Sequence, residues 1–94
     1  MSTTYDTDKF VKLAHENGTP LIDVRPPEMY AEGHIPGAIN IPLADIATAD
    51  VKPGSYMYCM TGYHGGLATE ELAKRGIKVT DIGGMDYYHG PIEK

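Results

Sequence analysis

Cysteine, basic side chains and long apolar segments are all scarce in this sequence. The single cysteine, Cys59, cannot form an intrachain disulfide, so hydrophobic packing must hold the fold together and nothing indicates an oxidising compartment. No apolar run approaches the roughly 20 residues that a membrane-spanning helix needs. Residues 1–10 also lack the basic and then apolar pattern of a signal peptide. We therefore expect a cytoplasmic protein with no membrane partner.

The charge balance is acidic. Aspartate and glutamate number 13 against 8 lysines and arginines, which gives a formal net charge of -5 at pH 7. Such a chain has no general electrostatic attraction to polyanions. We therefore expect no nucleic-acid partner.

Helical and extended patterns alternate along the chain. Its 94 residues allow one compact core, so we expect a single domain over residues 1–94. Strands are predicted at residues 21–24, 38–41, 55–59 and 78–82. Helices are predicted from cap candidates at residues 4–8 to a stop at Gly18, at 27–32, weakly at 43–49, and from near Gly65 to Gly76. Because parallel strands need crossover connections, this alternation predicts a mainly parallel sheet covered on both faces.

The residues after Cys59 form the most distinctive segment. Glycines at positions 62, 65 and 66 permit positive φ angles, and successive backbone N–H groups can then form an anion-binding nest. The helix that follows directs the positive end of its dipole into the same space, which favours a thiolate. This pattern indicates a nucleophilic cysteine at the carboxyl end of a strand, where sites in parallel sheets lie. The alternative is a small buried hydrophobe, the commoner fate of a lone cysteine, which suits a polar glycine-rich loop poorly.

Four motifs, in order, resemble the rhodanese homology domain over about residues 21–88. They are Asp-Val-Arg at 23–25, Tyr-x-x-Gly-His-Ile-Pro-Gly-Ala-Ile-Asn-Ile-Pro at 30–42, Tyr-Cys-x-x-Gly at 58–62, and Gly-Gly at 83–84. The resemblance implies a rhodanese-like α/β fold with a central, mainly parallel sheet of about five strands and helices on both faces. It also implies a sulfurtransferase without a cofactor, in which a cysteine takes sulfur from thiosulfate or a persulfide. The acceptor would be a thiol, cyanide or a protein.

The resemblance also implies roles for particular residues. The sulfur carrier would be Cys59, and the amides that hold the persulfide would come from Met60, Thr61, Gly62, Tyr63, His64 and Gly65. Asp23 and Arg25 would support the rim of the pocket; the alternative for Arg25 is an exposed ion pair with Glu28, which would be worth little. Gly83 and Gly84 would form a tight backbone turn close to the cysteine loop.

No metal site is expected. The four histidines are scattered along the sequence, and the single cysteine has no partner at the spacing of metal ligands.

The length of the loop separates sulfur transfer from phosphate chemistry. Cysteine-dependent phosphatases carry an arginine six positions after the nucleophile to grip the phosphoryl oxygens, and here that position is Gly65. The related sulfur-carrying loop is one residue tighter and ends in an arginine, which corresponds to His64. A histidine cannot bind two oxygens in a fork, so we expect weaker binding of the thiosulfate dianion, with His64 either an anion contact or a solvated side chain. The missing arginine keeps a second function open, that of a rhodanese-like module that binds a partner or senses redox state.

Overall fold

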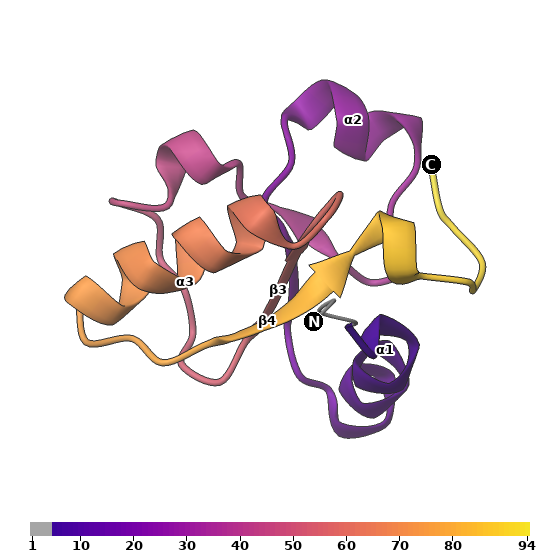
Figure 1. Cartoon of the computed structure of the whole chain (residues 1–94), viewed down its shortest axis with the longest axis horizontal. Helices are drawn as coiled ribbons and strands as arrows, with labels where there is room; N and C mark the ends of the chain where they lie inside the picture. The colour runs from indigo at the N-terminus through magenta and orange to yellow at the C-terminus, as the bar shows by residue number, and fades with distance from the viewer. Residues whose placement is uncertain (1–4) are drawn as a thin grey trace, which may run out of the picture.

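Four parallel strands form the centre of the molecule in the order β2-β1-β3-β4, of which β3 and β4 are labelled in Figure 1. The computed structural model describes residues 5–94. The strands are β1 (Leu21–Asp23), β2 (Ile39–Asn40), β3 (Tyr56–Cys59) and β4 (Thr80–Gly84). All three pairings between them are parallel, which confirms the predicted sheet. The resemblance implied about five strands, but residues 5–94 form four, because His34 and Glu93 make only an isolated antiparallel bridge.

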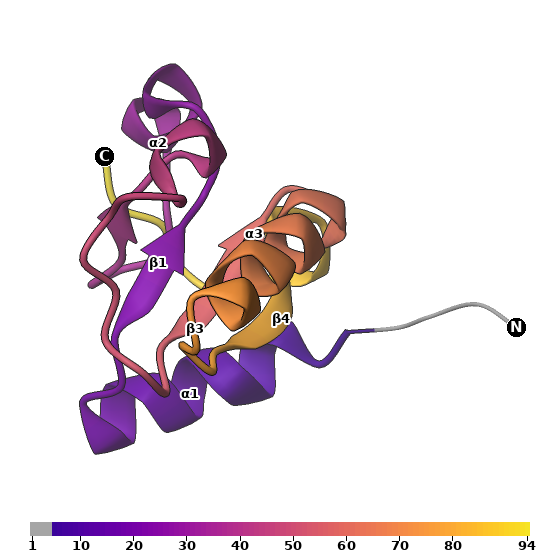
Figure 2. The ribbon, with the colours of Figure 1, turned by 90° about the vertical axis from the view of Figure 1, so that its left-hand side faces the viewer.

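Helices cover both faces of this sheet. They are α1 (Thr7–Asn17), α2 (Pro27–Glu32) and α3 (Tyr63–Lys74), with short 3-10 turns η1 (Leu43–Asp45) and η2 (Met85–Tyr87). Figures 1 and 2 show α1 and α3 on opposite sides of β3 and β4. None of the helices within residues 5–94 has the length and apolar character needed to cross a membrane.

Local sequence features explain where these helices begin and end. Gly18 takes a left-handed conformation with φ of 70° and donates its N–H to the carbonyl of Ala14, so α1 stops where the sequence predicts. Pro27 is the first residue of α2, again as predicted. Asp6 precedes α1 without forming a side-chain cap hydrogen bond, and Thr4, another predicted cap candidate, lies outside the described residues.

The core has two halves, one on each face of the sheet. One half packs against α3 and contains Ile22, Val24, Ile46, Val51, Met57, Cys59, Ala68 and Leu72. The other packs against α1 and contains Val11, Ala14, Leu21, Ile35, Ala38, Tyr58 and Ile82. Successive residues of β3 therefore point to opposite faces, and Cys59 lies on the α3 face.

The carboxyl end of β4 lies directly against the end of β3. Cys59 pairs with Gly84 in the sheet. A Cβ atom on Gly84 would overlap the backbone carbonyl oxygens of Cys59 and Met60, so only glycine fits this position. The N–H of Asp86 also donates to the Met60 carbonyl at 3.0 Å. The predicted close packing of Gly83 and Gly84 on the cysteine loop is confirmed, but the predicted turn is wrong, because the two glycines are the last residues of β4.

Candidate active site

The sulfur of Cys59 is buried and hydrogen-bonded to the backbone that follows it. The residue is 1% exposed and packs within the core half on the α3 face. The N–H of Gly62 donates to Sγ at 2.9 Å, and Sγ lies 3.9 Å from the carbonyl oxygen of Gly83. The site thus combines an apolar wall with a polar contact from the loop.

The connection between Cys59 and α3 is shorter than predicted. The helix begins at Tyr63 rather than near Gly65, so only Met60, Thr61 and Gly62 link strand to helix. Gly62 permits this because its φ is 98°, a left-handed value that favours glycine. A Cβ atom at Gly62 would also lie 2.6 Å from the ring of Tyr5.

The loop and the first turn of α3 present free amide groups. Gly62 donates to Cys59 Sγ and Tyr63 to the Thr61 hydroxyl. The other N–H groups of this segment have no hydrogen-bond acceptor among residues 5–94; they belong to Met60, Thr61, His64 and Gly65. Unpaired amides at a helix N-terminus are suited to bind an anion.

The side chains of the loop contribute less than its backbone. Tyr63 is 70% exposed, and His64 is exposed beside it with the two ring centroids 5.5 Å apart. His64 also borders a cavity of about 250 Å³, whose other lining residues are Val24, Pro26, Pro27, Pro42, Leu43 and Ala44. The imidazole therefore adjoins an apolar surface cavity at this edge of the sheet.

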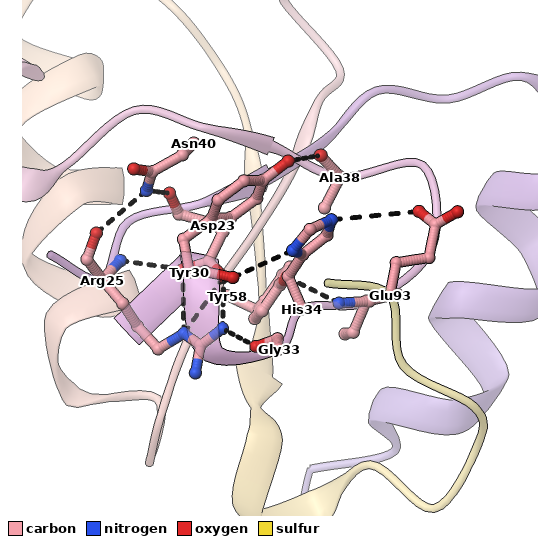
Figure 3. Close-up of polar contacts among 10 residues, drawn as sticks. Asp23, Arg25, Tyr30, Gly33, His34, Ala38, Asn40, Tyr58 and Glu93 are labelled. Atoms are coloured by element: carbon pink, nitrogen blue, oxygen red, sulfur yellow. Dashed lines mark hydrogen bonds and ion pairs between the residues drawn. The ribbon is translucent and has the colours of Figure 1, made fainter. Parts of the chain in front are cut away.

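Asp23 and Arg25 form a buried ion pair (Figure 3). Arg25 Nη2 lies 2.7 Å from Asp23 Oδ2, and Arg25 Nε donates to both carboxylate oxygens at 3.0 Å. The alternative pairing of Arg25 with Glu28 is wrong, because the guanidinium turns inward to a carboxylate at the strand end, where Asp23 is 0% and Arg25 4% exposed. Although burial opposes the charged form, the hydrogen bonds and charge of Asp23 raise the pKa of Arg25.

This pair makes its hydrogen bonds to segments other than the cysteine loop. Arg25 Nη2 also donates to the Gly33 carbonyl at 2.7 Å, and Asn40 Nδ2 donates to the carbonyls of Asp23 and Arg25 at 2.9 Å each. Within residues 5–94, neither side chain makes a hydrogen bond to residues 60–65. The pair therefore joins the end of β1 to α2, and its contribution to the loop is indirect.

Tyr58 lies beneath the guanidinium on the α1 face. The Arg25 Cζ atom is 6.0 Å from its ring centroid, and the Tyr58 hydroxyl accepts a hydrogen bond from the Ile35 N–H at 3.1 Å. Burial, together with the charge of Asp23, raises the pKa of Tyr58. The phenol is therefore neutral and structural.

Replacement of Tyr58 by phenylalanine is expected to destabilise the protein by about 1–3 kcal/mol, because the buried Ile35 N–H loses its acceptor. Urea unfolding followed by circular dichroism measures this change. The matched control is Tyr56→Phe, on the same strand but only half-buried, for which we expect a change within about 0.5 kcal/mol. Equal effects of the two substitutions would contradict the assignment.

His34 is tied into the same region. Its Nδ1 donates to the Tyr30 carbonyl at 2.9 Å, and its ring stacks on that of Tyr30 with centroids 3.8 Å apart. Its backbone pairs with Glu93 (Figure 3). Within residues 5–94 there is no group of three or more His, Cys, Asp or Glu side chains that could hold a metal ion.

Two residues near Cys59 were not predicted from the sequence. Asp81 accepts a hydrogen bond from the Gly83 N–H at 3.0 Å, and the Tyr5 hydroxyl donates to it at 3.3 Å. Burial raises the pKa of Asp81 against the opposing effect of these hydrogen bonds. The presence of a carboxylate inside a predicted strand could have marked Asp81 as a candidate site residue, whereas no sequence feature pointed to Tyr5.

The family of the chain follows from comparison with known proteins. A family model described as "Rhodanese-like domain" matches residues 6–90. The chain belongs to the rhodanese-like domain family. Thiosulfate sulfurtransferase PspE of Escherichia coli is 44% identical to this rhodanese-like chain over an alignment of 71 positions that covers 68% of each protein. A tRNA sulfurtransferase of Thermoplasma acidophilum is 32% identical over 82% of the chain, but this match spans only 16% of that protein.

Solved structures show the same fold. A rhodanese with anions from E. coli superposes with a TM-score of 0.70 at 35% identity, covering 81% of this chain and 98% of that one. The human single-domain sulfurtransferase TSTD1 gives a TM-score of 0.73 at 22% identity, over 84% of this chain and 88% of that one, which is a likeness of fold alone. The rhodanese-like fold predicted from the motifs is confirmed, and the names of PspE and of the T. acidophilum relative both specify sulfur transfer.

Proposed function

We propose that this rhodanese-like domain transfers sulfane sulfur by carrying it as a persulfide on Cys59. The Cys59 thiolate attacks the outer sulfur of the donor and forms a new S–S bond, while the donor's own bond to that sulfur breaks. When thiosulfate is the donor, the leaving group is sulfite. When an organic persulfide is the donor, the leaving group is a thiolate. An acceptor thiolate or cyanide then attacks the outer sulfur of the persulfide, which releases an organic persulfide or thiocyanate and restores the Cys59 thiolate.

The observation that carries this proposal is the hydrogen bond from the Gly62 N–H to Cys59 Sγ at the start of α3. A persulfide extends the side chain by one sulfur, which is also anionic. The free amides of Met60, Thr61, His64 and Gly65 are the donors available to stabilise that charge. Because Cys59 is 1% exposed, the proposal requires residues 60–62 to move when the donor enters.

The relatives support the reaction type and leave the substrates to be determined. The name of the E. coli relative specifies thiosulfate, whereas those of other relatives specify tRNA or a sulfur carrier. We therefore propose thiosulfate or a persulfide as donor, and a small thiol, cyanide or a protein as acceptor. The single free cysteine suits the cytoplasm, where thiols are kept reduced.

Intact mass spectrometry tests the proposal directly. After incubation with thiosulfate or cysteine persulfide, the protein is expected to gain one sulfur atom and to lose it again when a reducing thiol is added. Cys59→Ser is the matched control, and it is expected to gain none because Cys59 is the only thiol in the chain. A gain that persists in Cys59→Ser, or no gain with either donor, would end the proposal.

A second function is favoured by one observation, the burial of Sγ. A cysteine that is 1% exposed and packed against apolar side chains also suits a rhodanese-like module that binds a partner or senses redox state. Alkylation with iodoacetamide at neutral pH separates the two functions. If the native protein reacts more slowly than the urea-unfolded chain and gains no sulfur, the result would favour the binding or redox-sensing module over the sulfurtransferase.

A further inference from the structure

We propose that Asp81 sets the donor specificity of this domain, so that it takes sulfur from donors with at most one negative charge, such as organic persulfides, in preference to the thiosulfate dianion. This inference rests on the proposed persulfide function and names the class of donor. It follows from the position of the Asp81 carboxylate relative to the loop, to the sulfur and to the cationic side chains.

The carboxylate touches the segment that offers the free amides. A Cβ atom on Gly65 would lie 2.6 Å from Asp81 Oδ1, and one on Gly66 would lie 3.8 Å from Oδ2. Gly65 is buried in the first turn of α3, and its N–H is one of those without an acceptor among residues 5–94. The negative charge of Asp81 therefore stands beside the turn that would hold an anionic donor.

Two short chains of contacts connect this carboxylate to the sulfur. On one side, Asp81 accepts a hydrogen bond from the N–H of Gly83, whose carbonyl oxygen lies 3.9 Å from Cys59 Sγ. On the other side, Tyr5 donates its hydroxyl hydrogen to Asp81, and its ring covers Gly62, the residue that donates to Sγ. Burial raises the pKa of Tyr5, and the charges of Asp81 and then of Cys59 raise it further, so this hydroxyl interacts electrostatically with both groups.

Among the residues that the structure describes, no cation pairs with the carboxylate. Within residues 5–94, Asp81 takes part in none of the ion pairs. Arg25, which also follows the carboxyl end of a strand, is engaged by Asp23 and the Gly33 carbonyl. His64 takes the place of the arginine expected in a sulfur-carrying loop, and its side chain borders the apolar cavity. Among the described residues, the charged side chain that contacts the loop is therefore an unpaired carboxylate.

Charge decides which donor this arrangement disfavours. At equal distance, Asp81 repels a dianion twice as strongly as a monoanion. Thiosulfate brings two negative charges to the loop, whereas cysteine persulfide, a zwitterion apart from its sulfur, brings one at most. Removal of the Asp81 charge should therefore help thiosulfate more than the persulfide.

A purely structural role for Asp81 makes a different prediction. If the side chain served only to hold the turn at Gly83, its replacement would change transfer from all donors alike. Asp81→Asn separates the two roles, because the amide oxygen can still accept the Gly83 N–H and the amide NH2 group can donate to the Tyr5 hydroxyl, while the charge is lost.

The experiment compares second-order rate constants for the gain of one sulfur on Cys59, measured by rapid quenching and intact mass. Thiosulfate and cysteine persulfide are the two donors. For Asp81→Asn we expect the constant for thiosulfate to rise about three- to tenfold and that for cysteine persulfide to change less than about twofold. Asp50→Asn is the control, since Asp50 is exposed, precedes β3 and takes part in none of the hydrogen bonds around Cys59, and it is expected to alter neither constant.

Asp81→Ala provides a second variant that removes the charge together with both hydrogen bonds, and the same selective gain for thiosulfate is expected. An unchanged ratio of the two constants in both variants would overturn the role of Asp81. Failure of the unmodified protein to accept sulfur from either donor would instead overturn the proposed function, so the two failures are distinguishable.

Discussion

Arg25→Met is expected to destabilise the protein by about 3–5 kcal/mol, the largest stability loss that the structure predicts. The substitution leaves the Asp23 carboxylate, which is 0% exposed, without the guanidinium that binds both of its oxygens. It also removes the donor to the Gly33 carbonyl. Because small domains are stable by only about 5–15 kcal/mol, the variant should unfold at much lower urea concentration than the unmodified protein.

The matched control for this prediction is the double variant Asp23→Leu/Arg25→Met. It removes both charges and fills the site with apolar atoms, so most of the lost stability should return. A single variant that loses less than about 1 kcal/mol would show that water reaches the Asp23 carboxylate, contrary to its burial here.

Gly84→Ala is expected to cost about 3 kcal/mol and to disturb sulfur transfer at the same time. The added methyl group overlaps the carbonyl oxygens of Cys59 and Met60, which are backbone atoms and cannot rotate away. The φ of Gly84 is 178°, an extended value that alanine adopts, so the cost comes from the overlap alone. Thermal unfolding and the rate of sulfur gain on Cys59 measure the two effects.

Gly66→Ala is the control for the glycine prediction. Its new methyl group would meet only Asp81 Oδ2 at an ordinary 3.8 Å, and its position is inside α3. Alanine is the better helix former, so the expected change ranges from none to a gain of about 1 kcal/mol. If Gly84→Ala changed the stability as little as Gly66→Ala, β4 would not pack against the cysteine loop as described.

Much of the fold could be predicted because local chemistry determines it. Pro27 begins α2 and Gly18 ends α1 whatever surrounds them, and the strands are recognisable in the sequence as short apolar runs. The start of α3 could not be predicted in this way. Gly65 and Gly66 favour a loop by propensity, yet they lie inside the helix, because the left-handed turn occurs earlier, at Gly62.

The surroundings of the site depended on contacts that a single sequence conceals. The partner of Arg25 is Asp23, two residues earlier, and not the helical neighbour Glu28, because the strand ends where the guanidinium can fold back on it. Asp81 could be placed on a strand, but only the contact with Gly65 shows that it faces α3 and the loop. The proximity of Tyr5 to Gly62 joins residues far apart in sequence, which local patterns cannot reveal.

The strand order has a consequence for the newly synthesised chain. Every sheet pairing is parallel, so no hairpin can form first, and each ladder must wait for a long loop to close. Thr7 bonds to the carbonyl of Ile82, 75 residues away, and Gly84 closes over Cys59 from the same late segment. A nascent chain that has not yet emerged from the ribosome beyond residue 84 therefore lacks one wall around its thiol, which stays open to oxidants during translation.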